Sequence, residues 1–254
     1  MKCLDIKGVR IGEGRPKIIV SIMGGTLEES LRTVEAGKAA QVDCFEYRAD
    51  FADDVRDAAQ VVQDTVTLAE ALPENPLLFT FRSTEQGGKL TLPVEEYVAL
   101  NRSVIEAEAI DLVDIETWIG DDLVRELVDC AHAHGVAAVV SYHNFQETPP
   151  ATWMVELMSH MVELGADIPK VAVMAHDAKD ALELLSATEE MSRTRTDKPL
   201  LTMAMGREGS ITRLTGELFG SALTFCSLEQ ASAPGQVDVA RARRMMDDLH
   251  EVLK

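Results

Sequence analysis

Residues 112–143 read LVDIETWIGDDLVRELVDCAHAHGVAAVVSYH. An apolar run at 112–116 leads into an amphipathic stretch at 121–134, and a second apolar run follows at 136–143. Gly135 stands where the helical pattern stops, and glycine adopts the left-handed backbone of a helix C-terminus without strain. The segment therefore predicts a strand, a helix and a second strand, the repeating unit of a parallel α/β fold.

The same unit recurs along the whole chain. Further strands are predicted at 17–23, 43–48, 77–82, 168–174, 200–205 and 222–226, which makes eight. Further helices are predicted at 26–40, 54–72 and 94–107. The segment before Lys17 carries Gly8, Gly12 and Gly14, and we expect it to form a small hairpin that closes the bottom of the fold.

Eight parallel strands form either an open sheet or a closed barrel. The first strand-to-helix turn, Met23-Gly24-Gly25-Thr26, lacks the GxGxxG fingerprint of a dinucleotide-binding open sheet. A (β/α)8 barrel needs about 250 residues, and this chain has 254 with no linker or shift in composition. We therefore predict an α/β protein, a (β/α)8 TIM barrel with a short N-terminal β-hairpin, in which residues 1–254 form one catalytic domain.

The charge of the chain limits its partners. With 24 basic and 43 acidic residues, the formal net charge is -19, which repels nucleic acid and anionic membrane surfaces. An anionic small molecule would have to be held by a local cluster of arginines against this field. We expect a small-molecule ligand, with no nucleic-acid and no membrane partner.

The four cysteines are scattered, with no CxxC pair and no metal-ligand spacing. We interpret them as reduced, small core residues, and we expect neither a metal nor a cofactor. The N-terminus lacks a basic region followed by an apolar run, and no stretch approaches the roughly 20 apolar residues of a membrane span. The expected compartment is the cytoplasm.

Polar residues interrupt the predicted strands on one face. Barrel strands are covered on both faces, so charged side chains within them are costly unless they line a pocket. Side chains of one parity share a face, and (β/α)8 enzymes place their active sites at the C-terminal strand ends. We expect these residues to converge on one lumen: Ser21, Glu46, Arg48, Thr80, Arg82, Asp114, Glu116, Ser141, His143 and Lys170.

Some of these residues have plainer interpretations. Glu46 and Arg48 are also compatible with an ordinary ion pair at a strand end. Asp114 and Glu116 are expected to pair with the neighbouring arginines rather than to act directly in catalysis. The convergence of the whole set carries more weight than any one member.

Lys170 lies inside the apolar run Ile168-Pro169-Lys170-Val171-Ala172-Val173-Met174. Burial and nearby arginines favour the neutral amine, which is the form that attacks a carbonyl. The sequence therefore predicts a nucleophilic lysine that forms a Schiff base. The structural alternative is a lysine whose side chain extends from the strand start toward Asp167.

His143 ends the fifth predicted strand and precedes Asn144 and Phe145. A histidine at this junction is directed into the mouth of a barrel, and its ordinary pKa suits proton transfer near neutrality. We predict a general acid and base, the alternative being a hydrogen-bonded structural histidine.

Several short motifs follow one another along the chain. They are Phe45-Glu46-Tyr47-Arg48-Ala49-Asp50, Phe81-Arg82-Ser83, Ser141-Tyr142-His143-Asn144-Phe145, Lys170-Val171-Ala172, Met205-Gly206, Ile211-Thr212-Arg213 and Ser232-Ala233-Pro234-Gly235-Gln236. In this order they resemble the motifs of the type I 3-dehydroquinate dehydratases, the Schiff-base enzymes of the shikimate pathway. The similarity runs from about the first barrel strand to Gln236.

The resemblance implies a carbon-oxygen lyase that dehydrates 3-dehydroquinate, a hydroxylated cyclic keto acid, to 3-dehydroshikimate. It implies that Lys170 forms an imine with the ketone and that His143 removes the adjacent proton and returns protons for the loss of water. It also implies a homodimer. The substrate-binding residues it implies are Ser21, Glu46, Arg48 and Arg82 for the hydroxyls and rim, and Arg213, Ser232 and Gln236 for the carboxylate and its nearby hydroxyl.

The segment 232–236 independently predicts a mobile loop that closes over the mouth, because it is rich in small residues and contains Pro234 and Gly235. One position departs from the family pattern. The family commonly has a glutamate directly before its paired glycines, and Gln86 occupies that place before Gly87 and Gly88. We expect Gln86 to lie close enough to His143 to hydrogen-bond it.

Two other functions remain open from the residues. A class I aldolase-like barrel acting on a sugar phosphate would use the buried lysine equally well, with Gly206, Gly209, Gly216 and Gly220 near the phosphate. The second is an inactive barrel that binds a small acid as a sensor or scaffold. Arg213 and Gln236 favour a carboxylate over a phosphate, and the presence of Lys170 and His143 disfavours an inactive barrel.

Overall fold

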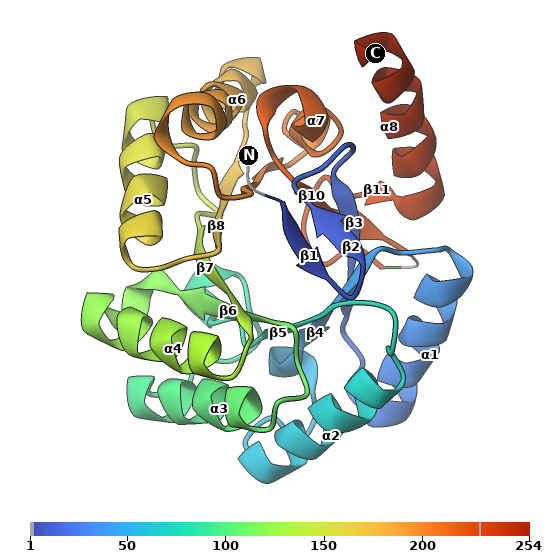
Figure 1. Ribbon diagram of the computed structural model, residues 1–254, viewed down its shortest axis with the longest axis vertical. Coiled ribbons are helices and arrows are strands. Elements are labelled where there is room, and N and C mark those ends of the chain that lie inside the picture. Colours follow the sequence, from blue (N-terminus) through green and yellow to red (C-terminus); the bar gives the residue numbers. More distant parts are fainter. Residues whose placement is uncertain (1–2, 229) are drawn as a thin grey trace.

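The computed structural model describes residues 3–228 and 230–254. In these residues eight parallel strands form the barrel wall, and helices surround it (Figure 1). The strands are β3 (Lys17–Ile22), β4 (Cys44–Arg48), β5 (Leu77–Thr80), β6 (Leu112–Glu116), β7 (Ala137–His143), β8 (Ile168–Met174), β9 (Leu201–Met205) and β10 (Leu223–Ser227).

The strand order shows that the sheet closes on itself. From β10 the order runs through β3, β4 and each following strand to β9. A parallel bridge between Leu200 and Ser221 joins β9 to β10, and Ala222 N donates to Leu200 O at 2.7 Å. A short strand, β11 (Val237–Asp238), pairs with the end of β10. The predicted (β/α)8 barrel is confirmed, and each predicted strand lies within two residues of its observed bounds.

The helices follow the strands in alternation. They are α1 (Leu27–Ala39), α2 (Ala58–Glu70), α3 (Val94–Glu106), α4 (Asp121–Ala133), α5 (Ala151–Glu163), α6 (Ala178–Glu190), α7 (Gly216–Phe219) and α8 (Val239–Leu253). Short helical turns follow several strands or helices: η1 (Ala49–Phe51), η2 (Thr84–Gln86), η3 (Thr117–Ile119), η4 (Met191–Arg195) and η5 (Ser210–Arg213).

Side-chain caps explain where two of the helices begin. Thr26 and Glu29 form a reciprocal capping box at α1. At α2, the Asp57 side chain accepts from the backbone N–H groups of Ala59 and Gln60. The predicted start of this helix at residue 54 is therefore wrong, because the Asp57 cap sets the first turn at Ala58.

The N-terminal hairpin, β1 (Leu4–Ile6) with β2 (Val9–Ile11), lies across one end of the barrel (Figure 1). Ile11 is fully buried and packs in a cluster with lumen-facing residues such as Ile19 and Leu78. This confirms the predicted hairpin that closes the bottom, and it leaves the opposite end for a site.

The four cysteines are free, but only Cys44 and Cys226 are buried. Cys3 and Cys130 are partly exposed, so the prediction of core positions is wrong for these two. Across residues 3–228 and 230–254, none of the helices combines the length and the apolar character required to cross a membrane.

Candidate active site

A cavity opens at the C-terminal ends of the barrel strands. Ten residues are predicted from the sequence to act in catalysis, to bind the substrate or, for Gln86, to contact His143. Nine of these ten line the cavity: Glu46, Arg48, Arg82, Gln86, His143, Lys170, Arg213, Ser232 and Gln236. The tenth, Ser21, lies at its edge, where its hydroxyl contacts Glu46 Oε2 at 2.6 Å and Ser232 Oγ at 3.1 Å.

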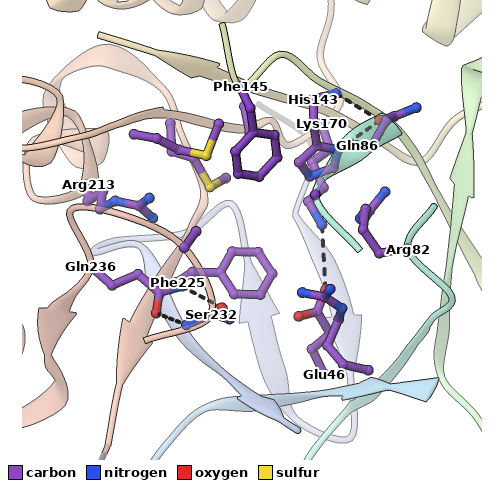
Figure 2. A pocket seen from close by; sticks show the side chains of 16 residues that line it. Glu46, Arg82, Gln86, His143, Phe145, Lys170, Arg213, Phe225, Ser232 and Gln236 are labelled. Carbon is purple, nitrogen blue, oxygen red and sulfur yellow. Dashed lines mark hydrogen bonds and ion pairs between the residues drawn. The ribbon is translucent and has the colours of Figure 1, made fainter. Parts of the chain in front are cut away.

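The Lys170 side chain extends into this cavity (Figure 2) and is 2% exposed. Its Nζ donates to Asp114 Oδ2 at 2.8 Å and lies 3.6 Å from Glu46 Oε1. Asp167 instead accepts from Lys198 Nζ at 3.0 Å, so the alternative in which Lys170 reaches Asp167 is wrong. The amine therefore lies beside two carboxylates. The sequence places all three residues in the lumen, but it does not predict that the two carboxylates pair with Lys170.

Arg82 holds both carboxylates of β6. Its NH2 lies 2.7 Å from Asp114 Oδ2, and its NH1 donates to Glu116 Oε1 at 2.6 Å. Ser141 completes the group, because its hydroxyl donates to Asp114 Oδ1 at 2.6 Å. The predicted pairing of Asp114 and Glu116 with an arginine is thus observed for Arg82.

These ion pairs fix the charges of the group. Burial disfavours the charged Asp114, but the Arg82 guanidinium and the Lys170 ammonium outweigh it and hold the pKa of Asp114 well below its ordinary value. Burial likewise opposes the charge of Arg82, and the carboxylates of Asp114 and Glu116 raise its pKa above the ordinary value. Asp114 is therefore an anion and Arg82 a cation throughout the physiological range.

His143 and Gln86 are in direct contact, as Figure 2 shows. Gln86 Oε1 accepts from the backbone N–H of His143 at 2.8 Å and lies 3.0 Å from its Nδ1. The backbone N–H can only donate, so the side-chain atom is the amide oxygen, and Nδ1 must carry the proton in the neutral ring. Gln86 therefore leaves the Nε2 lone pair of His143 free to accept a proton.

The surroundings of His143 keep it neutral. Burial is the largest cause, followed by the positive charges of Arg82 and Lys170, and together they lower the pKa of His143 well below its ordinary value. Asp114 opposes this shift without cancelling it. An imidazole that is deprotonated at neutral pH is in the form that a general base requires.

Glu46 and Arg48 do not form the ordinary ion pair considered as an alternative. Arg48 binds Asp50 through two hydrogen bonds, Nε to Oδ1 at 2.7 Å and NH2 to Oδ2 at 2.8 Å. Asp50 Oδ2 also accepts from Lys89 N at 3.1 Å, which ties Arg48 to the loop that carries Gln86. Glu46 accepts from Thr80 at 3.0 Å as well as from Ser21, and it faces the cavity.

Arg213 lies across the cavity from Lys170 and His143 in Figure 2. Its NH2 donates to Pro234 O at 3.2 Å, while Nε and NH1 have no hydrogen-bond partner among residues 3–228 and 230–254. Burial lowers the pKa of Arg213 to about 10. At neutral pH it is therefore a buried cation with free donors, which suits an anionic ligand.

The loop at 232–236 lies over the cavity beside Arg213. Gln236 Nε2 donates to Ser232 Oγ at 2.7 Å, and Gly206 N donates to Pro234 O at 3.3 Å. Gly235 has a φ of 79°, and a Cβ there would lie 2.2 Å from Gly206 O. Only glycine permits this close approach, so the sequence of the loop fits its packing on the barrel.

Sequence reasoning missed the apolar wall of the cavity. Phe225 of β10 and Met203 of β9 line it, together with Met205, and all three belong to the lumen cluster. Their places along β9 and β10 follow the same period of two that located the polar residues. In a barrel strand, however, sequence alone does not distinguish an apolar side chain of the cavity from one of the core. Asp50 was also missed as the partner of Arg48.

Comparisons with known proteins agree over nearly the whole chain. The family described as type I 3-dehydroquinase matches residues 18–252. A curated 3-dehydroquinate dehydratase of Salmonella agona is 43% identical over 251 residues, which are 99% of this chain and 100% of the relative.

Solved structures show the same similarity. The type I 3-dehydroquinate dehydratase of Clostridium difficile, described with covalently modified comenic acid, has a TM-score of 0.95 and 39% identity, with 99% of each chain covered. The 3-dehydroquinate dehydratase of Geobacillus kaustophilus has a TM-score of 0.96 and 37% identity, with 100% of this chain and 98% of that one covered.

The contact between Gln86 and His143 predicts a pH effect. In Gln86→Glu a carboxylate replaces the amide and favours the imidazolium by opposite charge, which raises the pKa of His143. A base acts only when deprotonated, so the acid limb of the kcat/KM profile should move to higher pH in the variant. Profiles of both proteins over the acid range test this, and superimposable acid limbs would mean that position 86 does not affect the group that controls turnover.

Proposed function

This chain belongs to the type I 3-dehydroquinase family, and from that premise we propose that it dehydrates 3-dehydroquinate to 3-dehydroshikimate through a Schiff base on Lys170. It is a carbon-oxygen lyase of the 3-dehydroquinate dehydratase type. The observation that carries the mechanism is the Lys170 amine, which is buried in the lumen and directed into the cavity that His143 also lines. The covalently modified acid in the Clostridium difficile relative supports covalent chemistry in a site of this family.

The chemistry begins when the Lys170 amine, after losing a proton, attacks the ketone carbon. Loss of water from the adduct leaves an iminium, which draws electrons from the neighbouring C–H bond and makes it acidic. His143 Nε2 is free to take this proton, because Nδ1 is held by Gln86. The imidazolium then returns the proton to the leaving hydroxyl, and hydrolysis of the product iminium releases the enone and the amine.

The charges of the cavity support a carboxylate substrate. Arg213 offers the unpaired Nε and NH1, and the hydroxyl and amide of Ser232 and Gln236 lie beside it. On the other side, Glu46 and Arg48 line the cavity with Arg82 and are suited to hold the ring hydroxyls. Ser21 contributes through Glu46 and Ser232 at the edge.

The aldolase-like alternative has weaker support. The family match and the 43% identity extend over nearly the whole chain and name a dehydratase. Arg213 presents the free donors Nε and NH1 at the cavity, and its planar guanidinium matches a carboxylate in a bidentate manner.

We further propose that the protein is a homodimer, as the family resemblance implies, and that it lies in the cytoplasm. The four free cysteines are consistent with a reducing compartment. Sedimentation equilibrium of the purified protein tests the dimer, and a single species with the mass of one chain would refute it.

The reaction is tested by adding 3-dehydroquinate and following the near-ultraviolet absorbance of the conjugated enone. The parent should produce it without added metal. Lys170→Ala should fold and be essentially inactive, whereas His143→Ala should still form the imine and turn over about 100- to 10,000-fold more slowly. A parent that produces no enone, or a Lys170→Ala variant with parental turnover, would refute the proposal.

The proposed binding of the substrate carboxylate by Arg213 is tested by a matched pair of variants. Arg213→Lys keeps the charge but loses the planar fork, and Arg213→Ala loses both. We expect KM to rise in both variants and more in Arg213→Ala, measured with the same absorbance assay. Unchanged KM values in the pair would place the substrate carboxylate elsewhere.

A further inference from the structure

Among residues 3–228 and 230–254, Asp114 is the carboxylate closest to the nitrogen of Lys170. It is fully buried in the middle of β6, and each of its oxygens is engaged. Ser141 holds Oδ1 at 2.6 Å, while Oδ2 lies 2.8 Å from Lys170 Nζ and 2.7 Å from Arg82 NH2. Its position is therefore fixed by residues of β7 and β8 and of the loop after β5, and one oxygen is directed at the proposed nucleophile.

Other groups around Lys170 Nζ differ from Asp114 in distance or in charge. Glu46 Oε1 is 3.6 Å away, beyond a good hydrogen bond. The Phe225 ring centroid lies 4.8 Å from Nζ and presents a π-face to the cation. In the part of the chain that the structure describes, the remaining titratable or charged groups facing this part of the cavity are His143, Arg48, Arg82 and Arg213.

The charge on this nitrogen is the same before and after the proposed imine forms. A lysine ammonium and a ketone give an iminium and one water, so the nitrogen carries one positive charge in reactant and product. During the attack the amine is briefly neutral, and the proton it loses can rest on His143, which is unprotonated beforehand. A fixed anion at hydrogen-bond distance therefore matches the resting amine and the covalent intermediate equally well.

We propose that Asp114 is the counter-ion of the Lys170 iminium, an inference that rests on the proposed Schiff-base function. Its carboxylate accepts the iminium N–H, keeps the covalent intermediate protonated, and so maintains the form that activates the neighbouring C–H bond. An isolated cation in a buried lumen would be strongly disfavoured without such a partner.

Glu116 provides a matched control from the same strand. It binds the other side of Arg82, at 2.6 Å, and it is equally buried. It has no contact with Lys170 within the described residues. Glu116→Gln and Asp114→Asn therefore remove the same charge next to the same arginine, but only Asp114→Asn removes it from the lysine nitrogen. Asparagine keeps the length of aspartate. Its single amide oxygen can accept from Lys170 while its amide nitrogen faces Ser141, whose hydroxyl can accept.

The experiment traps the imine with cyanoborohydride, which reduces only the protonated form, in the presence of 3-dehydroquinate across the alkaline range. Adduct on Lys170 is measured by mass spectrometry. In Asp114→Asn the alkaline loss of trapping should move to lower pH by about one unit or more, since that is the usual effect of an opposite charge at this distance. Glu116→Gln should keep the parental dependence of trapping on pH, even if the loss of its contact with Arg82 lowers turnover.

An unmoved profile in Asp114→Asn, or an equal shift in both variants, would overturn the counter-ion assignment. If Asp114→Asn does not fold, the parent is compared with the imine that the same ketone forms with a simple alkylamine in solution. The parent should remain trappable to clearly higher pH, and coincident profiles would overturn the assignment. Absence of any Lys170 adduct in the parent would instead refute the Schiff-base function itself, so the two failures are distinguishable.

Discussion

The ion pairs that Asp114 makes with Arg82 and Lys170 are the constraint on which the active site depends. Two carboxylates of β6, Asp114 and Glu116, face Arg82, which follows β5, and Lys170 of β8. None of the four side chains is more than 3% exposed. Unpaired charges there would each cost several kcal/mol even after relaxation. The four groups balance one another, which allows a lysine to remain at the centre of a barrel.

The same charges also determine which of the reactive groups are ionised. Asp114 remains anionic because Arg82 and Lys170 lie against it, whereas His143 remains neutral because burial and the same two cations oppose a further charge. The Lys170 amine, a fixed anion and a neutral imidazole therefore lie close together. On the far side Arg213 retains free donors, so a local cation attracts an anion in a chain whose net charge is -19. The strong acidity of the chain and an anionic substrate are compatible because the arginines lie inside the barrel.

The sequence predicted the barrel, the hairpin plug and the set of residues that meet in the lumen. This succeeded because a strand has a period of two, so charged residues of one parity must share a face. The same rule cannot determine which partner each charge selects. The rule does not predict that Arg48 binds Asp50 rather than Glu46. It also does not predict that Asp114 binds Lys170 as well as Arg82. Nor does it distinguish Met203 and Phe225, which line the site, from core residues, and it could not foresee that a cap at Asp57 delays the start of α2.

We propose that Lys170 bonds covalently to the substrate while Asp114 remains at its nitrogen. The most direct measurement is a crystal structure of the protein after borohydride reduction in the presence of 3-dehydroquinate. We predict continuous density from Lys170 Nζ to the former ketone carbon, Asp114 Oδ2 within hydrogen-bond distance of that nitrogen, and the carboxylate against Arg213. A ligand with no bond to the protein, or an adduct on Lys179 or Lys198 instead, would contradict it.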